Sequence, residues 1–204
     1  MTTPNLPLLT DDQIQTNVNR TVEFLHDLTN AGHTGFSPML KVIGLNKDLT
    51  TSEITIGLPD MPETFNGRAE MMFQLGVSIL KQGYIPLAAI FHSEAWMSIL
   101  DKDENITCMP SEDPNKIEVV LVNCVTLDRK TCSSTLEIRR AEENITLVPY
   151  GPQADIIDCL DGNSLQIESN LLANFYYGVF NSLAEYLVNK FMPPIPPAHD
   201  FNLN

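Results

Sequence analysis

Four carboxylates in the middle of the chain are suited to acid–base chemistry. Glu94 lies in a short polar segment, Glu112 and Asp113 lie in a later acidic turn, and Glu118 follows that turn. Two carboxylates that meet across adjacent strands can share one proton at a raised pKa, so that one serves as the acid and the other as the base. One hypothesis is therefore a hydrolase with Glu94, Glu112 and Asp113 as its catalytic residues.

A structural role explains the same residues, and we favour it. The segment Ser111–Pro114 is typical of a turn that leads into a strand, because Ser and Asp side chains bond their own backbone and Pro fixes φ. Glu94 can pair with Arg139 or Arg140 if their strands are neighbours. The residue types alone leave both roles open.

His92 is a weak candidate for a metal ligand. With Glu94 it forms the H-x-E pattern of zinc-dependent nucleoside deaminases, in which the His binds zinc and the Glu transfers protons. The P-C-x-x-C motif that completes such a site is missing from the sequence, as are glycine-rich phosphate loops and the G-x-S-x-G nucleophile motif. We therefore expect neither a metal nor another cofactor.

The remaining candidate residues are suited to binding a protein. Trp96 is the only tryptophan, and aromatic side chains and arginines are enriched in protein interfaces. Ser93 lies on the same segment, Ser111 lies in the acidic turn, and Arg139 and Arg140 are adjacent basic residues in an acidic chain. We expect these five residues to take part in binding a protein partner or a second copy of the chain.

A β-sheet is expected to position these residues. Tyr84–Met97 begins as an apolar run too short to span a bilayer and places His92, Glu94 and Trp96 on alternate positions, which lie on one face of a strand. This segment is the expected central strand. Residues 117–127 are apolar at both parities, which is typical of a strand covered on both faces, and more polar runs continue to residue 150.

Three helices complete the expected fold. The first starts at the capping box of Thr10 and Gln13, the second runs from Thr64 to a stop at Gly83, and the third runs from about Gln166 to Phe191. We therefore predict an α+β fold with an antiparallel sheet of about five strands, in the order αββαβββα. Three helices on one sheet either cover both of its faces or leave one face for a partner.

Composition limits the function classes. The chain has 204 residues, with 12 Lys and Arg against 26 Asp and Glu, so its formal net charge is −14. This balance leaves no basic surface for nucleic acid or an anionic membrane. An inhibitor that mimics nucleic acid is a weaker alternative, because the carboxylates are dispersed along the chain. We expect an N-terminal arm (1–9), one domain (10–192) and a proline-rich tail (193–204).

Cysteine spacing and the N-terminus suggest a cytoplasmic protein. The four cysteines, at positions 108, 124, 132 and 159, form no C-x-x-C pair and have no His at metal-ligand spacing. We expect them to be reduced thiols. The first residues carry no basic and apolar segments of the kind that make a secretory signal.

Two short motifs carry a resemblance to a protein family. The segments Ser93–Met97 (SEAWM) and Pro110–Pro114 (PSEDP), followed by Glu118–Val122, resemble a family of small bacterial and phage-encoded proteins with no assigned activity. The resemblance covers roughly residues 36–150. It implies a bacterial or phage setting and two motifs that meet in space, and it implies no catalytic role for any residue.

Taken together, the residues favour a non-enzymatic protein-interaction or assembly module. We expect an acidic homodimer, or a subunit bound to a protein partner, in a bacterial cytoplasm or a phage particle. The hydrolase with Glu94, Glu112 and Asp113, with or without a metal at His92, is the alternative.

Overall fold

The computed structural model of the chain describes residues 7–98, 110–141, 144–151, 156–158 and 169–191. The acidic loop after Met97, Cys108, Cys159, the predicted start of the last helix, the proline-rich tail and most of the N-terminal arm lie outside this part. The elements in chain order are α1 (Asp11–Asn30), β1 (Met39–Leu45), β2 (Thr51–Gly57), α2 (Phe65–Lys81), β3 (Ile85–Met97), the 3-10 turn η1 (Pro110–Glu112), β4 (Ile117–Thr126), β5 (Lys130–Ala141), β6 (Asn144–Pro149), β7 (Ile157–Asp158) and α3 (Ser169–Phe191).

The α+β class and the three helices are confirmed, and the expected count of about five strands is low, since the sheet has six main strands and the short β7. The predicted order placed three strands between the second and third helices, whereas the structure has β3, β4, β5 and β6 there and the two-residue β7 as well. β5 and β6 form an antiparallel pair in which Ile138 lies opposite Leu147. Only one face of these two strands is well buried, so their apolar pattern is weak.

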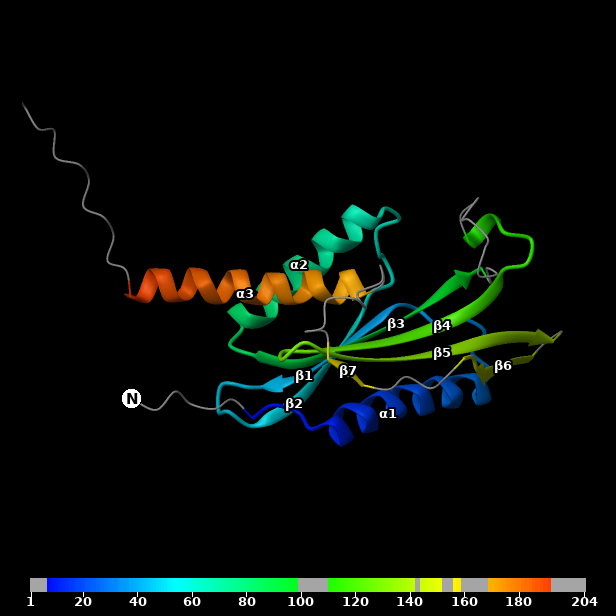
Figure 1. The fold of residues 1–204 in the computed structure, drawn as a ribbon, viewed down its shortest axis with the longest axis horizontal. Helices are drawn as coiled ribbons and strands as arrows, with labels where there is room; N and C mark the ends of the chain where they lie inside the picture. The colour runs from blue at the N-terminus through cyan, green and yellow to red at the C-terminus, as the bar shows by residue number, and fades with distance from the viewer. Residues whose placement is uncertain (1–6, 99–109, 142–143, 152–155, 159–168, 192–204) are drawn as a thin grey trace, which may run out of the picture.

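The main strands form one antiparallel sheet in the order β2-β1-β3-β4-β5-β6, with β7 paired to β5. The expected central strand, β3, is therefore an inner strand and pairs with both β1 and β4. β2 and β6 are the two outer strands of this order. The sheet is curled, and the helices lie on opposite sides of it (Figure 1).

Both faces of the sheet are covered by helices. α1 packs against β4, β5 and β6, whereas α2 and α3 pack on the other face (Figure 1). Alternation along β3 divides the core: Ile90 belongs to the cluster under α1, and Phe91 belongs to the cluster under α2 and α3. This arrangement confirms that the strand expected at 117–127 is covered on both sides. No helix in the described part of the chain is both long enough and apolar enough to cross a membrane.

The closest contact between helices is the crossing of α2 and α3. A Cβ atom on Gly76 would lie 2.0 Å from the carbonyl oxygen of Phe175, and one on Gly178 would lie 2.0 Å from the carbonyl oxygen of Phe73. The two glycines occupy equivalent places in the sequence F-x-x-G-V, which occurs once on each helix. The backbones of the two helices are therefore in direct and reciprocal contact, which leaves no room for a side chain.

Candidate functional site at the end of the sheet

The predicted site residues lie where β3 extends beyond β1. Met39, the first residue of β1, pairs with His92, so that Ser93–Met97 pair with β4 only. Burial decreases steadily along the face of β3 that carries α1: His92 is 4% exposed, Glu94 is exposed, and Trp96 is 45% exposed. A large aromatic side chain is therefore presented to solvent next to charged neighbours.

Glu94 fixes the loop that follows α1. Its carboxylate accepts a hydrogen bond of 2.7 Å from the backbone N–H of Phe36, and the Phe36 side chain is buried in the core under α1. A carboxylate that accepts a backbone N–H forms a strong, charge-assisted hydrogen bond. Glu94 thus joins the loop to β3, where it could otherwise have acted as a free base.

Arg140 joins three segments at the same end of the sheet. Its guanidinium donates to both carboxylate oxygens of Glu118 on β4, at 2.6 Å each, and to the carbonyl oxygen of Thr34 at 2.8 Å. The hydrogen bonds to Glu118 raise the pKa of Arg140, and the charge of Glu94 acts in the same direction. The sequence predicts a pairing of Arg140 with Glu94, whereas the structure shows Arg140 in a bidentate ion pair with Glu118.

Trp96 is connected to the acidic turn through Lys116. The Lys116 ammonium lies 4.7 Å from the centre of the Trp96 ring and donates a hydrogen bond to the carbonyl oxygen of Ser111. η1 itself contacts β3. The two motifs that suggested a family thus lie close together, and a cation–π contact of this kind is worth about 0.5–1 kcal/mol at an exposed site. We call Glu94, Trp96, Lys116, Glu118 and Arg140 the Trp96 surface.

Glu112 and Asp113 belong to the turn itself. The Asp113 carboxylate accepts the backbone N–H of Asn115 at 2.7 Å, as expected for a turn-forming aspartate. The polar groups near its carboxylate, the Ser98 hydroxyl first and the Asn115 N–H second, lower the pKa of Asp113, which is opposite to the raised pKa that a proton donor needs. No hydrogen bond or ion pair in the described residues joins Glu94 to Glu112 or Asp113.

The His92 side chain is buried and does not reach the surface. Burial lowers its pKa to about 4, so the imidazole is neutral at pH 7. Among the residues that the structure describes, no three His, Cys, Asp or Glu side chains lie close enough together to hold a metal ion. The neighbours of His92 across the sheet are Met39 and Val122, neither of which suits zinc.

Ser93 and Arg139 lie on the opposite face of the sheet from Trp96. Strand alternation separates Ser93 from Glu94, and Arg139 from Arg140. Arg139 pairs with Glu137 on its own strand at 2.8 Å. Of the predicted binding residues, the structure therefore brings Trp96, Ser111 and Arg140 to one end of one face, and it places Ser93 and Arg139 elsewhere.

Sequence reasoning missed two parts of the Trp96 surface. The sequence pattern points neither to Lys116 nor to the backbone of Thr34 and Phe36, which binds Arg140 and Glu94. The register explains the first omission: Trp96 lies opposite Glu118, so Lys116, two residues earlier, lies diagonally across from the ring. No local signal in the sequence fixes that register.

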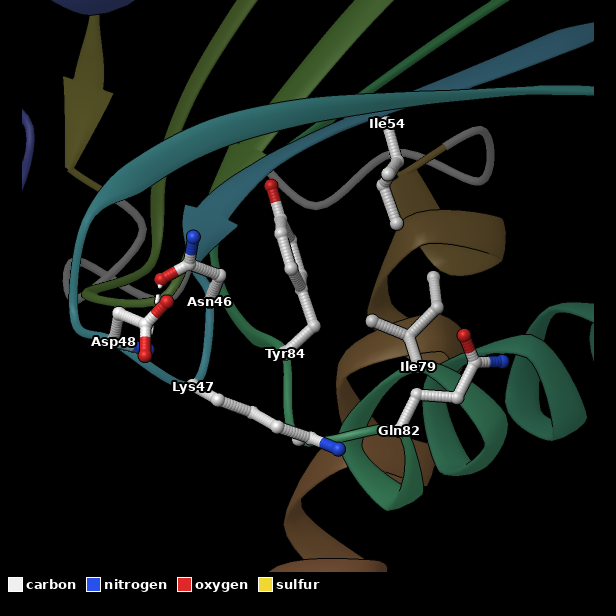
Figure 2. A pocket seen from close by; sticks show the side chains of 8 residues that line it. Asn46, Lys47, Asp48, Ile54, Ile79, Gln82 and Tyr84 are labelled. Atoms are coloured by element: carbon white, nitrogen blue, oxygen red, sulfur yellow. Dashed lines mark hydrogen bonds between the residues drawn. The ribbon is translucent and has the colours of Figure 1, made fainter.

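A pocket lies at the other end of β3, between the β1–β2 turn and the end of α2 (Figure 2). Its volume is about 300 Å³, and it has an apolar wall and a polar rim. The Tyr84 hydroxyl donates to the carbonyl oxygen of Ser52 and lies 3.3 Å from that of Val42, so this phenol is already bonded. None of the predicted site residues lines the pocket, whose walls are formed by Asn46, Lys47, Asp48, Ile54, Ile79, Gln82, Gly83 and Tyr84.

Comparison with known proteins gives no further assignment. No protein-family model matches the chain, and no curated protein or solved structure matches it. The assignment of the chain to the α+β class, with a curled antiparallel sheet, therefore rests on its structure alone.

Proposed function

We propose that the protein is a non-enzymatic interaction or assembly module that binds a protein partner through the Trp96 surface. The observation that carries this proposal is the exposure of Trp96, whose side chain is 45% exposed while the Lys116 ammonium contacts its ring. Tryptophan and arginine dominate the binding energy of protein interfaces when they lie near the centre. The cation–π contact favours one orientation of the ring by about 0.5–1 kcal/mol, so part of the entropy cost of ordering the ring is met before a partner binds.

The charges around Trp96 also suit a protein partner. Glu118 is satisfied by Arg140, Glu94 is satisfied by the Phe36 N–H, and Lys116 is satisfied by the ring and the Ser111 carbonyl oxygen. The surface therefore combines an apolar centre with a rim of paired polar groups, which is the usual composition of an interface. We expect the partner to place an apolar side chain against the ring and hydrogen-bonding groups around it.

The same contacts weigh against the hydrolase. Acid–base catalysis needs a carboxylate with a raised pKa within reach of substrate, whereas Glu94 and Glu118 are engaged and the pKa of Asp113 is lowered. A Glu94→Gln variant separates the two hypotheses, because glutamine keeps the oxygen that accepts the Phe36 N–H. Loss of a hydrolytic activity with the melting temperature unchanged would favour the enzyme.

Site-specific crosslinking tests the proposed interface. A photoreactive phenylalanine analogue at position 96 is expected to capture one partner from native lysate, and the same analogue at Phe65 on α2, another exposed aromatic, is expected to capture none. Trp96→Ala is expected to weaken binding of that purified partner at least tenfold, or about 1.4 kcal/mol, while Phe65→Ala leaves it unchanged. Equal binding by wild type and Trp96→Ala would contradict the proposal.

A further inference from the structure

We propose that the outer strand β2 pairs with β2 of a second copy of the chain, antiparallel and centred on Ile54. This inference goes beyond the Trp96 surface, because it uses a different strand and a different kind of contact. β2 is the last strand of the sheet order, and no strand in the described part of the chain lies beyond it. Its outer backbone groups are therefore available to extend the sheet.

The outward-facing backbone groups can be assigned from the hairpin. Asn46 N–H bonds the carbonyl oxygen of Thr50, and Leu58 N–H bonds that of Pro38, one at each end of the β1–β2 ladder. In an antiparallel pair, every second residue of a strand directs its backbone N–H and C=O groups toward the partner strand. The even-numbered residues of β2 therefore bond β1. The N–H and C=O groups of Thr51, Glu53, Thr55 and Gly57 therefore point outward, and all four residues are exposed.

β2 lacks the features that protect sheet edges, whereas β6 has one. The β1–β2 register runs without a bulge, and β2 contains no proline and one charged residue, Glu53, which bonds Lys41 of β1 at 2.8 Å. On β6 the Tyr150 N–H bonds the carbonyl oxygen of Thr135, so by the same alternation Pro149 takes an outward position. Proline at such a position removes a donor from the outer edge.

The sequence of β2 is complementary to itself in one register. Pairing centred on Ile54 places Thr51 opposite Gly57 of the second copy and Glu53 opposite Thr55, so all four outward-facing residues of each copy are used. That makes four residue pairs with two hydrogen bonds in each. Pairing centred on Glu53 would oppose two carboxylates, and pairing centred on Thr55 would oppose Thr51 to Pro59, which has no N–H.

Side chains fit this register as well. The Ile54 side chains of the two copies meet at the two-fold axis, on the face of the sheet that carries α2 and α3. On the α1 face each Glu53 lies beside a threonine, whose hydroxyl can donate to the carboxylate. The occupant that this edge fits is therefore a second copy of the chain.

Substitutions at Thr55 test the association. Thr55→Pro removes an outward N–H that β1 does not use, and Thr55→Glu opposes Glu53 of the second copy while it adds a carboxylate opposite Lys41 within its own chain. Both variants are expected to stay folded, as far-ultraviolet circular dichroism measures, and to raise the dimer dissociation constant at least tenfold. Thr55→Val keeps the backbone N–H and adds no charge, so it should raise the constant much less, through the loss of the hydroxyl alone. Sedimentation equilibrium measures that constant, and Trp96→Ala must not alter it. A monomeric wild type at high micromolar concentration, or a dimer unaffected in both variants, would overturn the proposal.

Cysteine crosslinking tests the register. Only residue 54 meets its own copy, so Ile54→Cys is expected to form an interchain disulfide under mild oxidation, because directly opposed residues are close enough for that bond. Ile56→Cys is the matched control. Residue 56 lies on the same face as residue 54, but in the proposed register it lies opposite Ser52 of the second copy, so this variant is expected to crosslink no more than wild type. Equal crosslinking at positions 54 and 56, or none at 54 in a folded protein, would refute the register.

Discussion

The crossing of α2 and α3 makes a prediction whose magnitude follows from the geometry. Changing Gly76 or Gly178 to alanine would place a Cβ atom 2.0 Å from a backbone carbonyl oxygen of the facing helix. An ordinary contact needs at least 3.4 Å, so the backbones must move apart by about 1.4 Å. Because the obstructing atoms are backbone, no change of rotamer can remove the clash.

Two opposing terms set the size of the effect. Overpacking costs about 1–3 kcal/mol, and the upper part of that range, about 2–3 kcal/mol, applies here because only backbone movement relieves the clash. Alanine gains back about 1 kcal/mol over glycine in a helix. We expect each single variant to lower the free energy of unfolding by about 1–2 kcal/mol. The two sites share one seam, so the separation forced by the first alanine already makes room for the second, and the double variant should cost clearly less than the sum.

Denaturant unfolding followed by circular dichroism measures these free energies. Gly57→Ala is a control, because a Cβ atom there meets nothing within 4 Å. Its free energy of unfolding should not fall, and it should rise by up to about 1 kcal/mol because alanine has fewer conformations than glycine in the unfolded chain. The reasoning fails if either helix variant is as stable as wild type, or if the two losses add in full.

Three further predictions concern the site and the core. Arg140→Met leaves Glu118 without its partner and should cost about 1–2 kcal/mol of stability. Arg140→Lys should recover little of that loss, because lysine cannot make the bidentate contact. Thermal melts measure both variants. Burial lowers the pKa of His92 to about 4 in the folded chain, against about 6.5 unfolded, so its contribution is present above pH 6.5 and is lost as the pH falls toward 4. Between pH 7 and 5 the wild type should lose about 2 kcal/mol more than His92→Phe in denaturant titrations, and parallel curves would contradict the assignment. Burial raises the pKa of the thiols of Cys124 and Cys132, so both should react with a thiol reagent only after unfolding. Mass spectrometry of peptides from protein labelled in the native state checks this, and a label on either cysteine would contradict it.

The ends of the first two helices could be predicted from sequence because their signals are local. Thr10 and Gln13 form the capping box within one turn, Thr64 caps α2, and Gly83 takes the positive φ of 84° that ends it. The partners in the site depend on strand register, which involves residues far apart in the chain. The carboxylate that pairs with Arg140 proved to be Glu118 and not Glu94, because β3 and β5 are not neighbours: β4 lies between them.

The two proposed surfaces are compatible within one assembly. In an antiparallel pairing through β2 the two-fold axis is perpendicular to the sheet, since the two Ile54 side chains lie on the same face. The α1 faces of both copies then point the same way, and so do their Trp96 surfaces. A partner with two binding segments could therefore engage both copies, and its second contact would benefit from a high effective concentration. Thr55→Pro should consequently weaken binding of a divalent partner while binding of a single segment stays constant, whereas Trp96→Ala should weaken both.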